Sequence, residues 1–171
     1  LEGDDYIRSG KFHGWRPELY GIGVMKKKIG ILGMGRLGRA FAKIISGLES
    51  DVKYYDQKLL TSELQKTLNV EYLDFEQLLE WSDYIVTMLP LTQATFHKIN
   101  QESLSRVRQG AFLINVGRGS TVDEAAVADS LDSGHLAGYA ADVFEMEDWA
   151  RADRPNGIDH RLIGDRANTF F

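Results

Sequence analysis

The sequence contains no cysteine among its 171 residues. This absence excludes disulfide-bonded scaffolds, thiolate zinc sites, iron–sulfur clusters and cysteine nucleophiles. Long apolar runs are also lacking. None approaches the ~18 residues that a membrane-spanning helix requires, and no signal-peptide pattern opens the chain. We therefore expect a cytoplasmic protein with no membrane partner.

Basic residues are not in excess either. The chain has 20 Lys and Arg against 25 Asp and Glu, which gives a formal net charge of −5. A dedicated nucleic-acid-binding protein usually shows a basic excess, so we expect no nucleic-acid partner. The lysines at 26–28 are better interpreted as a solvated entry into a strand. With 43% hydrophobic and 26% charged residues, the composition is that of a globular domain with one core.

Strand-like and helix-like segments alternate from Lys28 onward. Short apolar runs predict strands, and apolar residues repeated every three or four positions predict helices. This alternation predicts an α/β protein with a doubly wound parallel sheet, whose ligands bind at the carboxyl ends of the strands. Strands are predicted at 28–32, 51–56, 70–73, 84–89, 111–116 and 137–144, and helices at 36–48, 61–68, 75–81, 100–107 and 121–131, the last of them capped by Thr121.

A glycine-rich turn, Gly33-Met34-Gly35-Arg36-Leu37-Gly38, separates the first predicted strand from the first predicted helix. Gly33 would make the tight turn, Gly35 would let a pyrophosphate approach the backbone, and Gly38 would let the helix lie close to the sheet. The start of the helix offers N–H groups and a positive dipole end to phosphates. We therefore expect a Rossmann-type dinucleotide-binding domain at residues 28–171, with Arg36 and Leu37 in its cofactor site. Tight packing alone would also favour these glycines.

An acidic residue, Asp56, ends the second predicted strand. A carboxylate there can accept hydrogen bonds from both hydroxyls of an adenosine ribose, and it would repel a 2′-phosphate. Two like charges about 4 Å apart repel each other by up to roughly 4 kcal/mol at an effective dielectric near 20. Half of that energy favours NAD over NADP by more than tenfold, although Lys58 would partly offset a phosphate. A surface aspartate at a strand end is the alternative.

Two further strand ends carry candidate site residues. Met88, Leu89 and Pro90 follow the fourth strand, where the adenosine side of a dinucleotide would lie, although apolar packing alone would also explain Met88 and Leu89. The fifth strand ends in Asn115-Val116-Gly117-Arg118-Gly119-Ser120, which places Val116, Gly117 and Arg118 at the ligand edge. An arginine between two glycines has a planar fork suited to an oxyanion substrate. A structural salt bridge is the alternative role for Arg118.

Acidic residues gather after the last predicted strand. Asp142, Glu145, Glu147 and Asp148 lie within seven residues. Such a cluster can suggest a cation site, but acidic pairs within a charged loop are usually just solvated. We therefore expect no metal here.

These motifs together resemble the D-2-hydroxyacid dehydrogenases, over nearly the whole chain from Lys28 on. Within that family, the run 138–155 (GYAADVFEMEDWARADRP) looks like phosphonate dehydrogenases, which oxidise phosphite to phosphate with NAD. The resemblance implies that Arg118 binds the substrate oxyanion, that Glu147 pairs with a catalytic histidine, and that Asp142 contacts the nicotinamide end. It also implies a homodimer and a connecting helix and loop at residues 1–27.

In the family that this chain resembles, the catalytic histidine lies just beyond a stretch similar to residues 168–171. The chain opens at Leu1 and stops at that point, so we expect a nucleotide-binding fragment that lacks most of the substrate domain. The four histidines of the chain do not match the catalytic position, and we expect each at the surface or at a helix end. They are His13, His97, His135 and His160.

The sequence thus favours NAD-dependent oxidation of phosphite by the complete protein, with Arg118 and Glu147 in catalysis. An ordinary D-2-hydroxyacid dehydrogenase acting on a small 2-hydroxy or 2-oxo acid is the first alternative, because a carboxylate also presents oxygens to Arg118. A dinucleotide-sensing protein without turnover is the second. Both catalytic residues count against it, because a sensor needs no substrate clamp.

Overall fold

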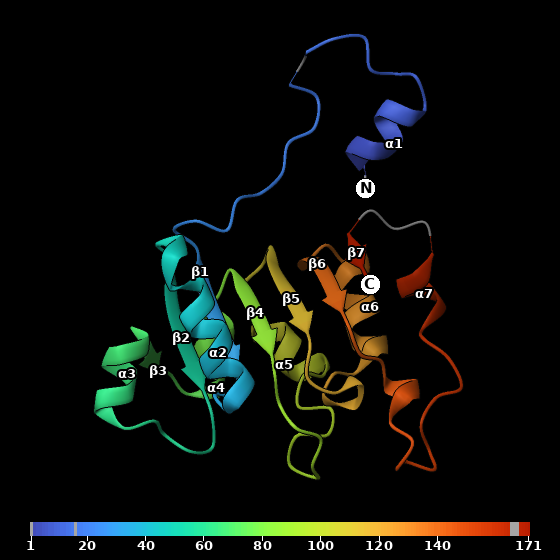
Figure 1. Ribbon diagram of the computed structural model, residues 1–171. Coiled ribbons are helices and arrows are strands. Elements are labelled where there is room, and N and C mark those ends of the chain that lie inside the picture. Colours follow the sequence, from blue (N-terminus) through green and yellow to red (C-terminus); the bar gives the residue numbers. More distant parts are fainter. Residues whose placement is uncertain (1, 16, 165–167) are drawn as a thin grey trace.

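The computed structural model describes residues 2–15, 17–164 and 168–171. Its centre is a seven-stranded sheet in the order β3-β2-β1-β4-β5-β6-β7, and every described pair of neighbouring strands is parallel. The predicted doubly wound sheet is therefore confirmed (Figure 1). The strands are β1 (Lys28–Leu32), β2 (Asp51–Tyr55), β3 (Glu71–Tyr72), β4 (Tyr84–Thr87), β5 (Ala111–Asn115), β6 (Leu136–Ala141) and β7 (Thr169–Phe170).

Helices connect the strands and cover the sheet. They are α2 (Arg36–Ile45), α3 (Ser62–Leu68), α4 (Phe75–Trp81), α5 (Gln101–Arg106), α6 (Glu124–Asp132) and α7 (His160–Ile163), with short 3₁₀ turns η1 (Ser46–Leu48), η2 (Gly119–Thr121) and η3 (Glu145–Glu147). The strand order reverses at β1, which lies between β2 and β4. Because all the strands are parallel, the loops that leave their carboxyl ends meet at one edge, and the reversal opens a crevice there.

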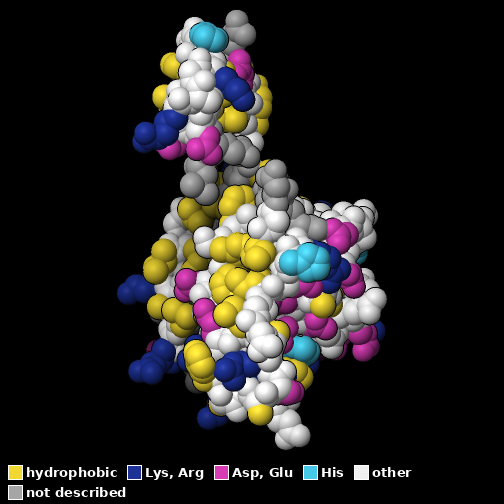
Figure 2. Space-filling model, turned by 90° about the vertical axis from the view of Figure 1, so that its right-hand side faces the viewer, with side chains coloured by type: hydrophobic (Ala, Val, Ile, Leu, Met, Phe, Trp, Pro, Cys, Tyr) yellow, Lys and Arg dark blue, Asp and Glu magenta, His cyan; other side chains and the backbone are white. Residues whose placement is uncertain are grey.

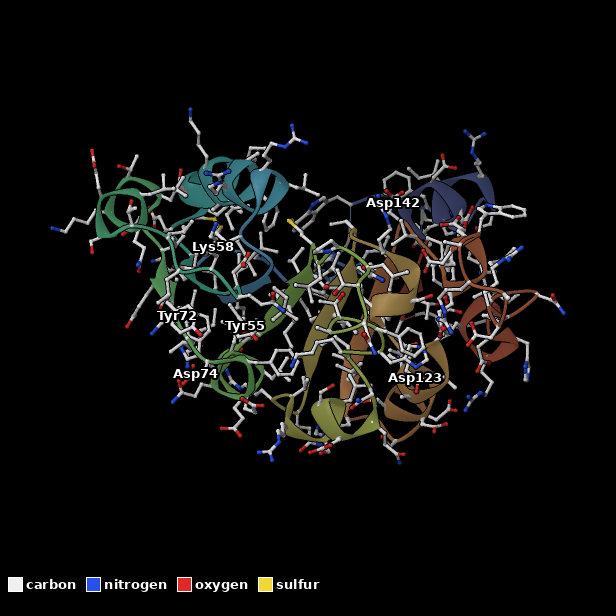
Figure 3. All side chains as sticks on the ribbon, turned by 90° about the horizontal axis from the view of Figure 1, so that it is seen from below. Tyr55, Lys58, Tyr72, Asp74, Asp123 and Asp142 are labelled. Atoms are coloured by element: carbon white, nitrogen blue, oxygen red, sulfur yellow. The ribbon has the colours of Figure 1, made fainter. Side chains whose placement is uncertain are left out.

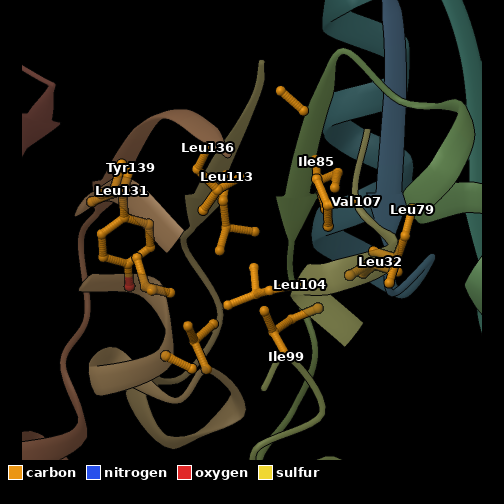
Figure 4. Packing of buried hydrophobic residues seen from close by; sticks show 14 of the residues in the cluster. Leu32, Leu79, Ile85, Ile99, Leu104, Val107, Leu113, Leu131, Leu136 and Tyr139 are labelled. Atoms are coloured by element: carbon orange, nitrogen blue, oxygen red, sulfur yellow. The ribbon is translucent and has the colours of Figure 1, made fainter. Parts of the chain in front are cut away.

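Two apolar cores cover the two faces of the sheet. Alternate residues of β1 point to opposite faces: Ile29 and Ile31 pack with Ala42 and Ile45 of α2, whereas Leu32 packs with residues of α4, α5 and α6. The larger core contains the fully buried side chains of Leu79, Ile85, Ile99, Leu113, Leu136 and Tyr139 (Figure 4). Burial of these strands on both faces explains their continuous apolar runs.

Several predicted bounds differ from the structure, among them those of the strand predicted at 84–89, which ends at Thr87. The last strand ends at Ala141, not at position 144, and it is followed by η3, α7 and a further strand, β7, where the sequence shows little periodicity. The predicted helix 36–48 ends at Ile45 and continues as η1. The N-cap of α6 is Asp123, whose side chain accepts from Ala126 N. Thr121 is not the cap, because its hydroxyl donates to Arg118 O at 2.7 Å.

The N-terminal segment stands apart from the sheet. It holds helix α1 (Glu2–Arg8) and a long connection that leads to β1 (Figure 1). Large apolar side chains on it are exposed, among them Trp15 (89%) and Tyr20 (82%), and Figure 2 shows this lobe projecting from the rest of the molecule. None of the described helices is long and apolar enough to cross a membrane.

Candidate functional site

The glycine-rich turn adopts the backbone geometry that the sequence predicts. Gly33 has φ +98°, and a Cβ there would lie 3.0 Å from Met88 O, so this turn requires glycine. A Cβ on Gly38 would lie 2.2 Å from Gly33 O, so α2 packs closer than alanine allows. A Cβ on Gly35 would meet no described atom within 4 Å, so the backbone there is open to a ligand. The turn is thus packed tightly against the protein at Gly33 and Gly38, and at Gly35 it has the open face that a pyrophosphate needs.

Asp56 holds the glycine-rich turn against the end of β2. Its Oδ2 accepts from Met34 N at 2.6 Å, and its Oδ1 accepts from Lys58 N at 3.0 Å. Asp56 is therefore more than the surface aspartate of the alternative reading. Each carboxylate oxygen has a further lone pair, so the same group can still accept from ribose hydroxyls. Figure 3, which looks onto the carboxyl ends of the strands, shows Lys58 and Tyr55 on this side of the site and Asp142 on the other.

Two cavities adjoin the turn, and Met88 lines both. The first, of about 380 Å³, is lined by Gly33, Gly35, Asp56, Leu89 and Pro90, which are all predicted cofactor residues. The second, of about 630 Å³, runs along α2, and three further predicted residues line it, namely Leu37, Val116 and Asp142. The predicted cofactor residues Arg36, Gly38, Gly117 and Arg118 line neither cavity. Arg36 is exposed at the start of α2.

The loop after β5 is held in shape by the buried side chain of Asn115. Its Oδ1 accepts from Gly117 N at 3.1 Å, and its Nδ2 donates to Arg118 O at 3.1 Å. A Cβ on Gly117 would lie 2.7 Å from Leu89 O, which shows how closely this loop approaches the loop after β4. Arg118 itself is exposed, and its Nη1 donates to Gly117 O at 2.8 Å. The guanidinium therefore lies at the ligand edge of the sheet.

The two predicted acidic residues after β6 are both exposed. Asp142 lies in the wall of the second cavity, and its backbone N donates to Asn115 O at 3.0 Å, which ties β6 to β5. Glu147 lies in η3, where its Oε2 accepts from Phe144 N at 3.1 Å. Arg118 and Glu147 therefore lie on neighbouring loops at the same edge, and the backbone turn already orients the Glu147 carboxylate.

The acidic cluster does not converge. Glu145 turns into the protein, Glu147 faces its own backbone turn, and Asp148 accepts from Ser120 N at 2.7 Å. Among the described residues, no group of three or more histidines and carboxylates is placed to hold a metal ion. The carboxylates of Glu145, Glu147 and Asp148 thus each have a hydrogen-bonding role of their own.

A buried pair of glutamates, which no sequence pattern predicts, lies next to the site. Glu124 and Glu145 are 4% and 7% exposed, and each accepts from the other's backbone: Glu145 N donates to Glu124 Oε1 at 2.8 Å, and Glu124 N donates to Glu145 Oε1 at 3.2 Å. Burial raises the pKa of the Glu124 carboxyl above its ordinary value. Burial likewise raises the pKa of Tyr139 in the adjacent core.

One histidine also differs from the prediction. His97 is half-buried rather than a surface residue, and its Nε2 lies 2.8 Å from Glu145 Oε2. The two residues are 48 positions apart, so no local pattern signals the pair. His135 is also half-buried, with its Nε2 2.8 Å from Val107 O, whereas His13 and His160 are exposed as expected.

Comparison with known proteins gives this site its context. Residues 1–168 match the family model described as "D-isomer specific 2-hydroxyacid dehydrogenase, NAD binding domain". The chain belongs to this family. The expected cofactor, NAD, therefore agrees with the family, and the glycine-rich turn, Asp56 and the two cavities fit that dinucleotide.

Individual relatives agree with this assignment. A glyoxylate reductase of Korarchaeum cryptofilum is 40% identical over 149 residues, which cover 86% of this chain and 45% of the relative. The structure of the PH0520 protein from Pyrococcus horikoshii OT3 matches with a TM-score of 0.84 at 35% identity, over 99% of this chain and 49% of that one. A D-lactate dehydrogenase from Aquifex aeolicus, complexed with NAD and lactic acid, matches with a TM-score of 0.75 at 30% identity, over 84% of this chain and 42% of that one.

This chain therefore spans about half the length of the relatives that it matches. The matched model describes the NAD-binding domain of the 2-hydroxyacid dehydrogenase family, and neither it nor these relatives bears specifically on phosphonate dehydrogenases. When bound, NAD supplies a nicotinamide ring that accepts or donates a hydride. In this chain, the glycine-rich turn and the two cavities lie at the carboxyl edge of the sheet, and Arg118 is exposed on the neighbouring loop.

Proposed function

We propose that this chain is the cofactor-binding part of a dehydrogenase that transfers hydride between NAD and C2 of a small 2-hydroxy or 2-oxo acid. The carrying observation is the exposed Arg118, which the Asn115 side chain holds on the loop beside the Val116–Asp142 cavity. The names of the relatives, glyoxylate reductase and D-lactate dehydrogenase, support a small 2-oxo acid as substrate.

The residues of the chain divide the work in this proposal. The backbone of the Gly33–Gly38 turn would bind the pyrophosphate, and Asp56 would bind the adenosine ribose. Arg118 would hold the substrate carboxylate with two parallel hydrogen bonds and stabilise charge that develops on the C2 oxygen. Glu147 would raise the pKa of the catalytic histidine that the family resemblance implies, and would fix its tautomer.

Oxidation of phosphite is a second candidate, favoured by the sequence of residues 138–155. In that reaction a general base would take a proton from water as the water oxygen bonds to phosphorus, the P–H bond would break, and its hydride would reduce NAD⁺ to NADH as phosphate is released. A phosphite carries more negative charge than a monocarboxylate, and the loop that carries Glu147 also carries Arg151 and Arg154. Arg118 would bind either oxyanion.

A direct assay of the full-length protein separates these functions. We expect oxidation of NADH with glyoxylate or another small 2-oxo acid, and an Arg118→Gln variant should lose about 100-fold or more in kcat/KM. Reduction of NAD by phosphite but not by 2-hydroxy acids would replace the first function with the second. Binding of NAD without turnover of either substrate class would instead support the sensor.

The isolated chain gives a complementary test. Because this chain spans about half the length of its relatives and none of its histidines matches the catalytic position that the resemblance implies, we expect residues 1–171 to bind NAD weakly, as followed by calorimetric titration, and to turn over neither substrate class. Measurable oxidation of phosphite or of a 2-hydroxy acid by this chain would contradict this assignment of roles.

We also propose that the chain forms a homodimer in a cytoplasmic enzyme. The N-terminal segment supports this, because it exposes large apolar side chains such as Ile7, Trp15 and Tyr20. Several large exposed apolar side chains on one segment are typical of protein–protein contacts. The remaining partner would be the small oxyanion substrate.

A further inference from the structure

Three loops at the carboxyl ends of β4, β5 and β6 are joined by a closed ring of hydrogen bonds. The backbone N of His97, after β4, donates to Ser120 O at 2.9 Å. Ser120, after β5, donates its own N–H to Asp148 Oδ2 at 2.7 Å. Glu145, on the same loop as Asp148 after β6, closes the ring through its 2.8 Å contact with His97 Nε2.

The backbone at His97 shows that this arrangement is imposed by its surroundings. His97 has φ +45°, a left-handed conformation that a residue other than glycine rarely adopts. The His97 ring stacks on the Phe96 ring with centroids 4.0 Å apart. The Arg151 guanidinium lies 3.9 Å from the centroid of the same Phe96 ring. Arg151 Nη1 is also 3.8 Å from Glu145 Oε2. The strained residue is thus held on several sides.

The loops after β5 and β6 are also in direct backbone contact. A Cβ on Gly119 would lie 1.9 Å from the carbonyl carbon of Phe144. Behind this contact, the buried Glu124 accepts from Glu145 N and fixes the start of η3. The ring of hydrogen bonds is therefore backed by close packing, so the loss of one of its hydrogen bonds is expected to shift the loops.

We infer that Asp148 and His97 are positioning residues that set the separation of Arg118 and Glu147. Arg118 precedes Ser120 by two residues, and Glu147 lies between Glu145 and Asp148. Each of the two candidate catalytic residues thus lies within two residues of a member of the ring. Neither Asp148 nor His97 needs to touch the substrate to act in this way. The inference rests on the proposed dehydrogenase function.

Hydrogen exchange of this chain tests the ring without any activity. Asp148→Ala removes the acceptor of the Ser120 N–H and should speed exchange of that amide by ~10-fold or more. Asp148→Asn keeps a side-chain oxygen as acceptor and should restore most of the protection. Glu63→Ala, an exposed carboxylate on α3 at the far edge of the sheet, is the matched control and should leave Ser120 unchanged. Equal exchange in all variants would overturn the inference.

Kinetics of the full-length protein test the consequence for catalysis. Asp148→Ala and His97→Ala should lower kcat by ~10-fold or more, because a displacement of about 1 Å is costly to a catalytic geometry. Their KM for NAD should stay within about twofold. Asp148→Asn should recover most of kcat, which a general loss of stability would not allow.

An unchanged kcat in both alanine variants, or an equal rise in the KM for NAD, would overturn the positioning role. If the unmodified protein turns over no substrate at all, the proposed function fails. The exchange of the Ser120 amide would still decide whether the ring exists, so the two failures are distinguishable.

Discussion

At the scale of single residues, Glu124 links pH to stability. Burial raises the pKa of its carboxyl above 4.5, although backbone N–H groups of Glu145 and Asp159 partly oppose that shift. Between 4.5 and the raised pKa, the folded chain binds more protons at this group than the unfolded chain. The contribution of Glu124 to the free energy of unfolding therefore falls as the pH rises through this window.

Glu124→Gln should abolish that part of the pH dependence. The glutamine keeps an oxygen for Glu145 N and does not titrate. We expect urea unfolding between about pH 4.5 and 7 to show a flatter stability profile for the variant than for the unmodified chain. Glu63→Gln, on the surface of α3, is the control and should leave the profile unchanged. Parallel profiles for Glu124→Gln and the unmodified chain would contradict the assignment.

A second prediction at this scale is that Asp56 sets the choice of cofactor. Asp56→Asn keeps an acceptor for either Met34 N or Lys58 N but removes the charge that a 2′-phosphate would meet. The preference for NAD over NADP should fall by ~10-fold or more, since like charges near 4 Å repel by up to about 4 kcal/mol at an effective dielectric of 20. Titration of this chain with both dinucleotides measures the ratio. An unchanged ratio would show that the charge of Asp56 does not discriminate.

At the scale of elements, the packing of α2 on β1 depends on Gly38. Gly38→Ala would place a Cβ 2.2 Å from Gly33 O, so the helix and the glycine-rich turn must separate. We expect a loss of about 1–3 kcal/mol in stability, together with weaker NAD binding. Gly47→Ala in η1 is the matched control, because its Cβ would meet no described atom within 4 Å. Similar melting temperatures for the two variants would argue against this tight contact.

Elements with a strong local pattern could be predicted from the sequence, and those that depend on a partner could not. The apolar run of β1 and the helix at Phe75–Trp81 agree with the prediction at both ends. The strand β7 has two residues and forms only by pairing with Tyr139 and Ala140, so it carries no periodicity of its own. The cap of α6 is a local miss instead, because Asp123 and not Thr121 accepts from the helix, at Ala126 N.

At the scale of the whole molecule, the parallel sheet brings motifs that are separate in the sequence to one edge. The rule that ligands bind at the carboxyl strand ends was enough to gather Gly33, Asp56, Met88, Arg118 and Asp142 at one edge. What no pattern revealed was how the loops hold one another, because the contacts among His97, Ser120 and Glu145 join residues far apart in the chain. Candidate site residues can be found from local sequence motifs, whereas the residues that hold the loops together can be identified only in the folded structure.

The N-terminal segment gives a prediction about assembly. It stands off the domain with Ile7, Trp15 and Tyr20 exposed, and Val24, whose O accepts from Ser50 Oγ, is where it joins the domain (Figure 1). Burial of these apolar side chains against a second copy would stabilise a dimer. A variant lacking residues 1–23 should therefore sediment as a monomer with an unchanged melting temperature, whereas the complete chain should sediment as a dimer. A monomeric complete chain, or a truncated chain that remains dimeric, would contradict this role, and the second result would place the interface on the domain itself.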